Sequence, residues 1–578
     1  MKQIWSYMKN YKKETVLAPL FKMLEACFEL CVPLVIAYIT DVGIVDGDKG
    51  FVVKMGLVLV ALAAIGLTCS ITAQYFSARA AVGVATKLRH NLFKHIESLS
   101  FTELDKIGTS TLITRMTSDV NQVQSGVNMF LRLFLRSPFI VFGAMIMAFA
   151  IDFKAALIFV VTIVLLLIVV FAIILYTIPM YKKVQAALDR VLGVTRENLT
   201  GARVIRAFGR EKDEIEEYDS RTDKLVRLQV GVGRISALMN PVTLLMVNIA
   251  TIILVWTGAV QVDNGSLTRG DVIALVSYMS QILVELVKLA NLIVTLTKAV
   301  ACGNRIEGVF NVTSSMELKD VLATDTGENV DSPYAIEFEH ASLKYDGGAE
   351  ESLSDVSFKV KRGETIGVIG GTGSGKSTLV QMIPRFYDVS SGAVKVFGRD
   401  VRDYNYKELR SKISIVLQKA ILFKGTIKEN ILWGNEDATD AQIMEALEIS
   451  QSKEFVEKKE EGIESPVEQG GKNLSGGQKQ RLTIARAVIR KPDILILDDS
   501  SSALDFATDS KLRAAIKNMN GEKETTVVIV SQRASAIMHA DKIVVLDDGM
   551  VAGIGTHDEL LESNQVYKEI YMSQNSAN

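Results

Sequence analysis

A glycine-rich loop in the second half of the chain contains the residues whose spacing most clearly indicates chemistry. It reads Gly370, Gly371, Thr372, Gly373, Ser374, Gly375, Lys376, Ser377 and Thr378. Glycine, four residues, then Gly-Lys-Ser is the spacing of a loop that cradles a polyphosphate. An apolar run that favours a strand precedes the loop, and a run that favours a helix follows it. In this context the backbone N–H groups and the positive end of the helix dipole face the phosphates.

Three side chains near this loop have expected roles with ATP and Mg²⁺. Lys376 is expected to reach the β- and γ-phosphates, and the Ser377 hydroxyl is expected to ligate Mg²⁺. Asp498 directly follows the apolar run 494–497, so its carboxylate is expected at a strand end, where it can hold Mg²⁺ through water. The sequence therefore predicts a site for ATP, with Mg²⁺ as its metal.

A second candidate anion site follows further along the chain. Its residues are Leu474, Ser475, Gly476, Gly477 and Gln478, at the start of a predicted helix. Serine and glycine at a helix start offer free N–H groups to an anion. One nucleotide in one site cannot use two separate cradles. We therefore expect the Ser475 loop to cap ATP that is held by a second subunit.

The overall composition favours a protein with a membrane part. The chain has 578 residues, which is too long for one ordinary core, so two or more domains are expected. Its hydrophobic fraction of 48% is high for a soluble protein. A net charge of −2 gives no global basic field, so nothing indicates a nucleic-acid partner.

Six apolar spans in the first three hundred residues predict membrane helices. Residues 55–78, 155–181 and 235–262 carry no charge, and each run exceeds the ~20 residues needed to cross a bilayer. We expect helices over about 15–40, 52–78, 127–151, 155–181, 236–262 and 271–297. Lysine and arginine gather at the N-terminus and in the two long connections, so both chain ends are expected in the cytoplasm.

The first, third and sixth spans contain charges toward their cytoplasmic ends. These are Lys22, Glu25, Glu29, Arg132, Arg136, Glu285 and Lys288. Two interpretations stay open: the spans line a water-accessible cavity, or the charges lie in the headgroup zone or beyond the bilayer. Glu285 and Lys288 are three residues apart and could form an ion pair.

The two long connections are expected to extend these helices into the cytoplasm. Small-residue turns near Gly108 and Gly201 would let the helices fold back and present short contact elements to a cytosolic domain. The chain then divides into a transmembrane domain over 1–319, a polar linker over 320–333 and an α/β domain over 334–578. Short β runs that alternate with helices predict a largely parallel sheet in that last domain.

Together these motifs resemble the ATP-binding cassette (ABC) exporters, specifically half-transporters with the membrane domain fused ahead of the nucleotide-binding domain. Residues 474–478 match the family signature. The resemblance implies a six-helix all-α transmembrane domain and an α/β P-loop ATPase domain with a helical subdomain that carries the signature. It also implies that Tyr345 stacks on adenine, that Gln418 touches Mg²⁺, and that Ser502 to Asp505 form a loop that communicates across a dimer.

Two positions depart from the family pattern. The family places glutamate after the Mg²⁺ aspartate, where this chain has Asp499, and histidine where it has Gln532. The aspartate carboxylate is shorter by about 1.5 Å, and a displacement of that order can cost ~100-fold in rate. Glutamine cannot carry the positive charge of a protonated imidazole. These departures predict a site that binds ATP and hydrolyses it poorly.

This asymmetry predicts an obligate heterodimer with a different half-transporter that carries the consensus catalytic residues. The resemblance implies ATP-driven export of small amphipathic or hydrophobic compounds by alternating access, in a bacterial cell membrane and in contact with its lipid. Two alternatives stay open. One is a homodimeric exporter of lipid or peptide that tolerates Asp499 and Gln532, and the other is an ATP-gated channel or regulator.

Overall fold

The computed structural model describes residues 6–316, 332–346, 348, 350–501, 503–519 and 525–575. The linker predicted over 320–333 lies almost wholly outside these residues, and so does Ser502. The chain forms two compact units, one of Met1–Glu97 with Ser110–Val312 and the other of Ser98–Thr109 with Thr313–Asn578. The second unit thus includes a short segment from the first third of the sequence, which differs from the contiguous division predicted above.

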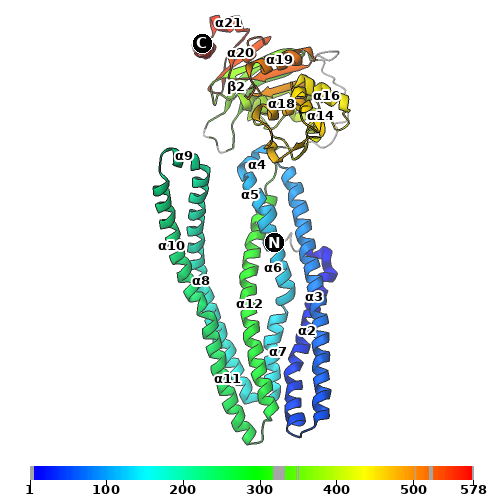
Figure 1. Cartoon of the computed structure of the whole chain (residues 1–578), viewed down its shortest axis with the longest axis vertical. Coiled ribbons are helices and arrows are strands. Elements are labelled where there is room, and N and C mark those ends of the chain that lie inside the picture. Colours follow the sequence, from blue (N-terminus) through cyan, green and yellow to red (C-terminus); the bar gives the residue numbers. More distant parts are fainter. Residues whose placement is uncertain are drawn as a thin grey trace. The chain divides into compact units, whose positions relative to one another are not determined.

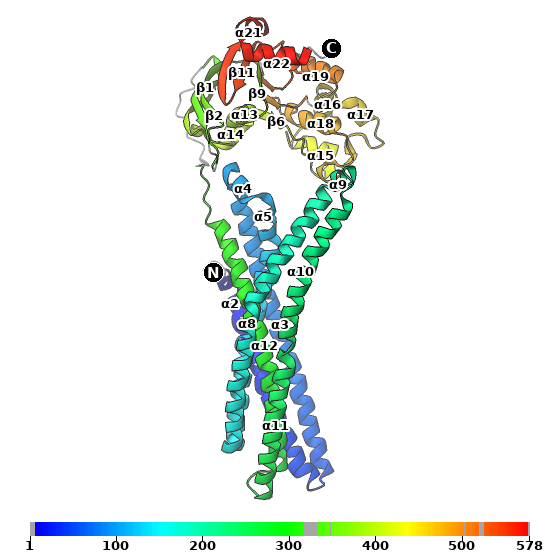
Figure 2. The same ribbon diagram turned by 90° about the vertical axis from the view of Figure 1, so that its left-hand side faces the viewer.

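The first unit consists of long helices, which run side by side in Figures 1 and 2. The main ones are α2 (Lys12–Tyr38), α3 (Lys49–Glu97), α6 (Val120–Leu133), α7 (Arg136–Ile151), α8 (Phe153–Thr200), α10 (Glu211–Ala237), α11 (Met239–Asp263) and α12 (Arg269–Phe310). Six helical stretches of the described chain are long and apolar enough to cross a membrane. This confirms the predicted six-helix transmembrane domain. Several of these helices extend well beyond the apolar spans, as the long connections predict.

The predicted turns in the long connections are present. Gly108 separates α4 (Phe101–Ile107) from α5 (Thr109–Thr114), and it has a φ of 80° that favours glycine. Gly201 separates α8 from the short helix α9 (Ala202–Ala207). Each long connection therefore folds back through a short helix at a small residue.

The third span is divided, where one continuous helix over 127–151 was predicted. α6 ends at Leu133 and α7 begins at Arg136. Pro138 explains the break, because its nitrogen carries no hydrogen and cannot donate to the carbonyl of Phe134 four residues earlier. The break places Arg136 at the first position of a new helix inside the bundle.

Arg136 joins three of the spans through ion pairs, of which the one with Glu285 is buried. Its guanidinium donates from Nη1 to Glu285 Oε1 on α12 at 2.7 Å, and from Nη2 to Glu29 Oε2 on α2 at 2.6 Å. Ser137 Oγ and Lys288 Nζ also donate to the Glu285 carboxylate, each at 2.7 Å. The predicted pairing of Glu285 with Lys288 is confirmed. The cavity-lining interpretation is wrong for Arg136 and Glu285, which are 7% and 2% exposed and face other helices.

The second unit contains a six-stranded and a four-stranded sheet. The larger sheet has the order β12-β11-β3-β10-β9-β6, and all its strands are parallel except β12. Its strands are β3 (Thr365–Gly370), β6 (Ile413–Val416), β9 (Ile494–Asp498), β10 (Thr526–Val530), β11 (Lys542–Asp547) and β12 (Met550–Gly555). The antiparallel sheet has the order β2-β1-β4-β5, formed by β1 (Tyr334–Leu343), β2 (Leu353–Lys361), β4 (Ser391–Val396) and β5 (Arg399–Asp400). The predicted largely parallel sheet is confirmed.

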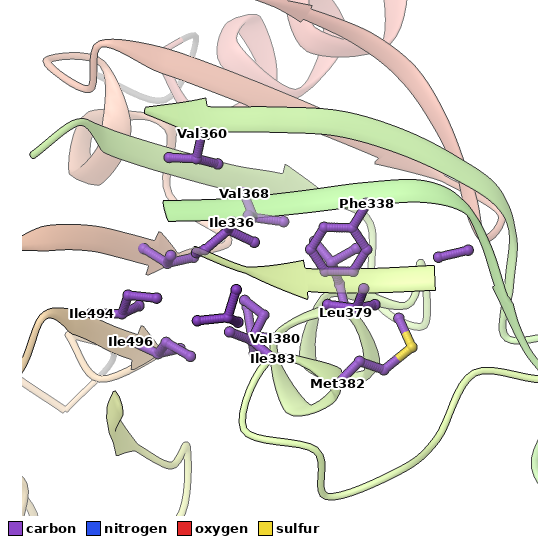
Figure 3. Packing of buried hydrophobic residues seen from close by; sticks show 14 of the residues in the cluster. Ile336, Phe338, Val360, Val368, Leu379, Val380, Met382, Ile383, Ile494 and Ile496 are labelled. Atoms are coloured by element: carbon purple, nitrogen blue, oxygen red, sulfur yellow. The ribbon is translucent and has the colours of Figure 1, made fainter. Parts of the chain in front are cut away.

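The helix that follows the phosphate loop anchors the core of this unit. α13 (Lys376–Met382) buries Leu379 and Met382 in a cluster with Phe338 of β1 and Ile496 of β9, as Figure 3 shows. A separate core holds the helical subdomain of α15 (Ile427–Leu432), α16 (Asp440–Ile449), α17 (Lys453–Glu457) and α18 (Gly476–Val488). The phosphate loop is therefore held between a buried strand and a buried helix.

The ion pairs of Arg136 make a prediction about stability. Arg136→Leu removes the cation that Glu29 and Glu285 share, and breaking such a buried pair costs about 3 kcal/mol or more. Lys288→Leu removes a cation from the same Glu285 carboxylate, but the Lys288 side chain is 41% exposed, so we expect a cost below about 1 kcal/mol. Thermal unfolding of the purified full chain in detergent measures both. Equal shifts of the midpoint for the two variants would contradict this assignment.

Candidate functional site: a nucleotide site at the end of the parallel sheet

The phosphate loop adopts a backbone shape that requires glycine. Gly373 and Gly375 have φ values of 86° and 89°, in the left-handed region. A Cβ on Gly375 would lie 2.6 Å from the carbonyl oxygen of Ser352 and 2.7 Å from Leu353 Cδ2. Gly371 has open space around the same position. The motif's glycines thus differ in what they contribute, and Gly375 is fixed by close packing at the start of α13.

The side chain of Lys376 folds back onto the phosphate loop. Its Nζ donates to the carbonyl oxygens of Gly370 at 2.9 Å and Gly371 at 2.5 Å. Burial lowers the pKa of Lys376, and the charges of Asp499 and Asp498 oppose that shift. Nζ also donates to Ser374 Oγ at 3.4 Å. An ammonium whose partners are all neutral oxygens of the loop is well placed to transfer its donors to the more strongly accepting oxygens of a phosphate.

Ser377 and Asp498 meet as the sequence predicts. The Ser377 hydroxyl donates to Asp498 Oδ1 at 3.0 Å. Burial raises the pKa of Asp498, the Ser377 hydrogen bond lowers it, and the neighbouring charge of Asp499 raises it further. A hydroxyl and a carboxylate are the oxygen donors that Mg²⁺ prefers, so these residues fit the metal. Bound there, Mg²⁺ would neutralise phosphate charge.

Asp499 and Gln418 face each other beside this pair. Gln418 Nε2 donates to Asp499 Oδ2 at 3.3 Å. The backbone of Asp499 has a φ of 47°, and its N–H donates to the Val530 carbonyl at 3.0 Å. Burial raises the pKa of Asp499, while the Gln418 hydrogen bond and Lys376 lower it. The residue at 499 is therefore locked to the end of β10 through its backbone, whichever side chain it carries.

Gln532 lies just past β10 with an exposed side chain, and its backbone is held by a residue that the sequence did not single out. Gln574 of α22 (Gln565–Asn575) donates from Nε2 to the Gln532 carbonyl at 2.7 Å. Its Oε1 accepts from the Ala534 N–H at 2.9 Å. Gln574 belongs to no recognisable motif, so no pattern in the sequence indicates this amide clamp.

Tyr345 contacts the end of the phosphate loop. Its hydroxyl donates to Thr378 Oγ1 at 3.1 Å. Burial raises the pKa of Tyr345, so the hydroxyl stays protonated and can donate. The aromatic ring predicted to stack on adenine is therefore tied to the first turn of α13.

The signature residues occupy a different element. Ser475 caps α18: its Oγ accepts from the Gln478 N–H at 3.3 Å, and Gln478 Oε1 accepts from the Ser475 N–H at 3.0 Å. Ser475 and Gly476 are exposed, whereas Leu474 is buried. Asp505 caps α19 (Phe506–Asn518) by accepting from the Thr508 N–H at 2.9 Å. The predicted role of these residues in another subunit's site stays a prediction.

Comparison with known proteins decides the family. A family model described as ABC transporter transmembrane region matches residues 15–286, and one described as ABC transporter matches residues 353–502. The chain is 36% identical over 574 residues to the uncharacterized ABC transporter ATP-binding protein YfiB of Bacillus subtilis (strain 168), with 99% of this chain and 98% of that protein covered. The chain belongs to the ABC transporter family.

Other relatives and a solved structure agree with this assignment. The transporter is 33% identical to the putative multidrug export ATP-binding/permease protein YgaD of Bacillus subtilis (strain 168), with 100% of this chain and 99% of that protein covered. It is 29% identical to the ATP-dependent lipid A-core flippase of Hahella chejuensis, with 99% and 96% covered. The structure of a bacterial Atm1-family ABC exporter with ATP bound matches with a TM-score of 0.79 at 23% identity, covering 97% of this chain and 98% of that chain.

These findings place the chain among the exporter half-transporters. It is a multi-pass membrane protein whose ATPase domain binds ATP and couples ATP hydrolysis to transport across the membrane.

The two glycines of the phosphate loop make a matched test. Gly375→Ala forces a Cβ against Ser352 and requires a positive φ, so we expect loss of ATP binding of at least about tenfold. Gly371→Ala adds the same methyl group in open space and should retain binding. Binding of ATP to the purified full chain, with thermal unfolding as a check on folding, measures both. Similar binding by the two variants would contradict the loop geometry.

Proposed function

We propose that this chain is the degenerate-site subunit of a heterodimeric ABC exporter for small amphipathic or hydrophobic compounds. The observation that carries the proposal is the pair Asp499 and Gln532 beside otherwise complete binding residues. The backbone of Asp499 is tied to the end of β10, so a shorter side chain cannot be compensated by a shift of the chain. The carboxylate then stops about one C–C bond, ~1.5 Å, short of the glutamate position.

Gln532 removes the second catalytic contribution. A glutamine amide can donate a hydrogen bond to a phosphate oxygen, but it brings no positive charge to the transition state. Lys376, Ser377 and Asp498 still have the contacts expected of a site that binds ATP with Mg²⁺. Binding and hydrolysis are therefore separated in this subunit.

The signature loop gives the subunit its part in hydrolysis. Ser475 and Gly476 lie exposed at the start of α18. The N–H groups of Ser475 and Gln478 are used in the capping box, so we expect those of Gly476 and Gly477 to face an anion of another subunit. In the proposed pair, the second half-transporter supplies the glutamate, the histidine and the phosphate loop of the working site. This chain completes that site with Ser475.

Each residue then has a defined part in the transport cycle. Lys376 holds the nucleotide phosphates, Ser377 and Asp498 hold Mg²⁺, and Tyr345 holds the base. The signature loop of each subunit closes over the other subunit's nucleotide, so closure requires ATP in both sites. Because ATP binds the closed state better than the open one, it shifts the membrane domains from inward-facing to outward-facing. Hydrolysis in the partner's site opens the pair again.

The location and cargo follow from the same proposal. Positively charged connections favour the cytoplasm for both chain ends, and the surrounding membrane is a bacterial cell membrane with its lipid. The relative YgaD is named as a putative multidrug exporter, which supports small amphipathic cargo. A homodimeric lipid exporter is the second candidate, because the Hahella relative is named as a lipid A-core flippase. Two different chains in the purified complex would support the heterodimer, and one kind of chain would support the homodimer.

The heterodimer predicts how ATPase activity is distributed. The purified chain alone should turn over ATP at least about 100-fold more slowly than the pair obtained by co-purification from its native membrane. In the pair, Ser475→Ala in this chain should reduce turnover strongly. Thr439→Ala is the matched control, because Thr439 caps α16 of the same subdomain in the same way. Full turnover by the lone chain would refute the heterodimer.

Restoring the consensus residues should restore hydrolysis. Asp499→Glu with Gln532→His is expected to raise the ATPase rate of this chain's own site by about 100-fold, since it returns the carboxylate and the charge. ATP affinity should stay within about threefold, because Lys376 and Ser377 are untouched. Single-turnover hydrolysis with the partner's site inactivated measures this rate. An unchanged rate in a folded double variant would show that these residues do not limit the site.

A further inference from the structure

The short helix α4 (Phe101–Ile107) packs within the second unit against residues that follow α13. The ring of Phe101 lies 4.8 Å from that of Phe386 and 6.3 Å from that of Tyr387, measured between centroids. The segment also bonds within this unit at its start, where Glu103 accepts from the Ser315 N–H at 3.1 Å. These contacts explain why Ser98–Thr109 belongs to the unit that carries the nucleotide site.

Two charged residues of α4 contact neighbours of Tyr345. Asp105 Oδ2 accepts a hydrogen bond from the Tyr387 hydroxyl at 2.6 Å, a short bond of the charge-assisted kind. Lys106 Nζ donates to Asp346 Oδ2 at 2.8 Å, and Asp346 directly follows Tyr345. Burial and the Asp105 carboxylate raise the pKa of Tyr387, so its hydroxyl remains a donor at neutral pH.

Tyr387 in turn fixes the ring of Tyr345. The two rings meet edge to face, with centroids 5.1 Å apart and planes at 87°, which is a favoured geometry for aromatic pairs. The Tyr345 hydroxyl is held at its other end by Thr378, next to the Mg²⁺ candidate Ser377. A cavity of about 350 Å³ borders these rings and Thr102 of α4, so a shift of α4 changes the space beside Tyr345.

We propose that Tyr387 is a positioning residue that holds Tyr345 in the orientation required for adenine, and that Asp105 of α4 holds Tyr387. This rests on the proposed role of Tyr345 at the nucleotide base. The contacts form one chain from α4 through Asp105, Tyr387 and Tyr345 to Thr378. Because coupling between two sites is reciprocal, a change in α4 alters base binding, and bound base alters the free energy of moving α4.

The position of α4 in the sequence gives this chain of contacts its meaning. α4 lies in the connection between the second and third membrane spans, Lys49–Glu97 and Thr109–Ile151. A rearrangement of those spans is transmitted along the backbone to α4. The proposed relay then connects the membrane spans to recognition of the base, separately from recognition of the phosphates by Lys376.

The test compares two ligands that share the phosphate chain and differ in adenosine, which carries the base that Tyr345 is proposed to hold. ATP and inorganic tripolyphosphate, each with Mg²⁺, are bound to the purified full chain. Tyr387→Leu should weaken ATP binding about three- to tenfold and leave tripolyphosphate binding unchanged. Tyr406→Phe is a control for hydroxyl loss, since no hydrogen bond of the Tyr406 hydroxyl occurs among the described contacts. Thermal unfolding verifies that every variant is folded.

A double-mutant cycle tests the link to α4. Tyr387→Phe removes this hydrogen bond and Asp105→Asn weakens it, so each should lower ATP affinity by about two- to fivefold, and the double variant by no more than Tyr387→Phe alone. Additive effects would overturn the link, and an unchanged ratio of ATP to tripolyphosphate affinity in folded Tyr387→Leu would overturn the positioning role. A wild-type chain that binds neither ligand would refute the nucleotide site itself. Lys376→Ala is the reference for loss of the nucleotide site, because it is expected to lose binding of both ligands.

Discussion

The parallel register of β3, β10 and β9 is the constraint on which the nucleotide site depends. Val530 pairs with Val368 on one side and with Asp498 on the other, so the ends of three neighbouring strands meet at one edge of the sheet. The phosphate loop, Asp498 and the residues after β10 then converge although they are far apart in the sequence. A slip of one residue in β9 would turn Asp498 to the opposite face and break its hydrogen bond with Ser377.

Much of this arrangement could be predicted from short stretches of sequence. The apolar spans have the length that a bilayer requires, and the phosphate loop carries its context with it. Asp498 ends an apolar strand, which is sufficient to bring it toward Ser377 once the sheet is parallel. These predictions succeed because the deciding interactions lie within one element or between elements that alternate regularly along the chain.

The features that sequence reasoning missed depend on contacts between distant segments. Gln574 reaches the backbone of Gln532 only because α22 packs beside the strand ends, and an amide side chain in an exposed helix carries no pattern of its own. Ser98–Thr109 belongs to the second unit because side chains of α4 contact residues that lie much later in the sequence. The break before α7 is different in kind, because Pro138 is a local signal that the apolar pattern obscured.

The buried charges of the membrane unit show how such a bundle uses polar residues. An arginine within an apolar bundle is costly unless its donors are paired, and the break at 134–135 lets Arg136 reach carboxylates on two other helices at once. α2, α7 and α12 are thereby tied at one level. We infer that such pairing helps to select which helices are neighbours, because Arg136 needs a carboxylate on each of the two other helices.

In the second unit, the residues expected to bind ATP differ from those expected to take part in its hydrolysis. The phosphate loop lies between the core strand β3 and the core helix α13, and at Gly375 an added Cβ would lie against Ser352 and Leu353. Asp499 and Gln532 follow the strand ends, where backbone bonds to Val530 and Gln574 fix their place regardless of their side chains. We therefore expect changes of these two side chains to leave ATP binding and folding largely intact. The proposed unequal pair requires a subunit that binds ATP without hydrolysing it, and this separation of the backbone contacts from the side chains at 499 and 532 is consistent with that requirement.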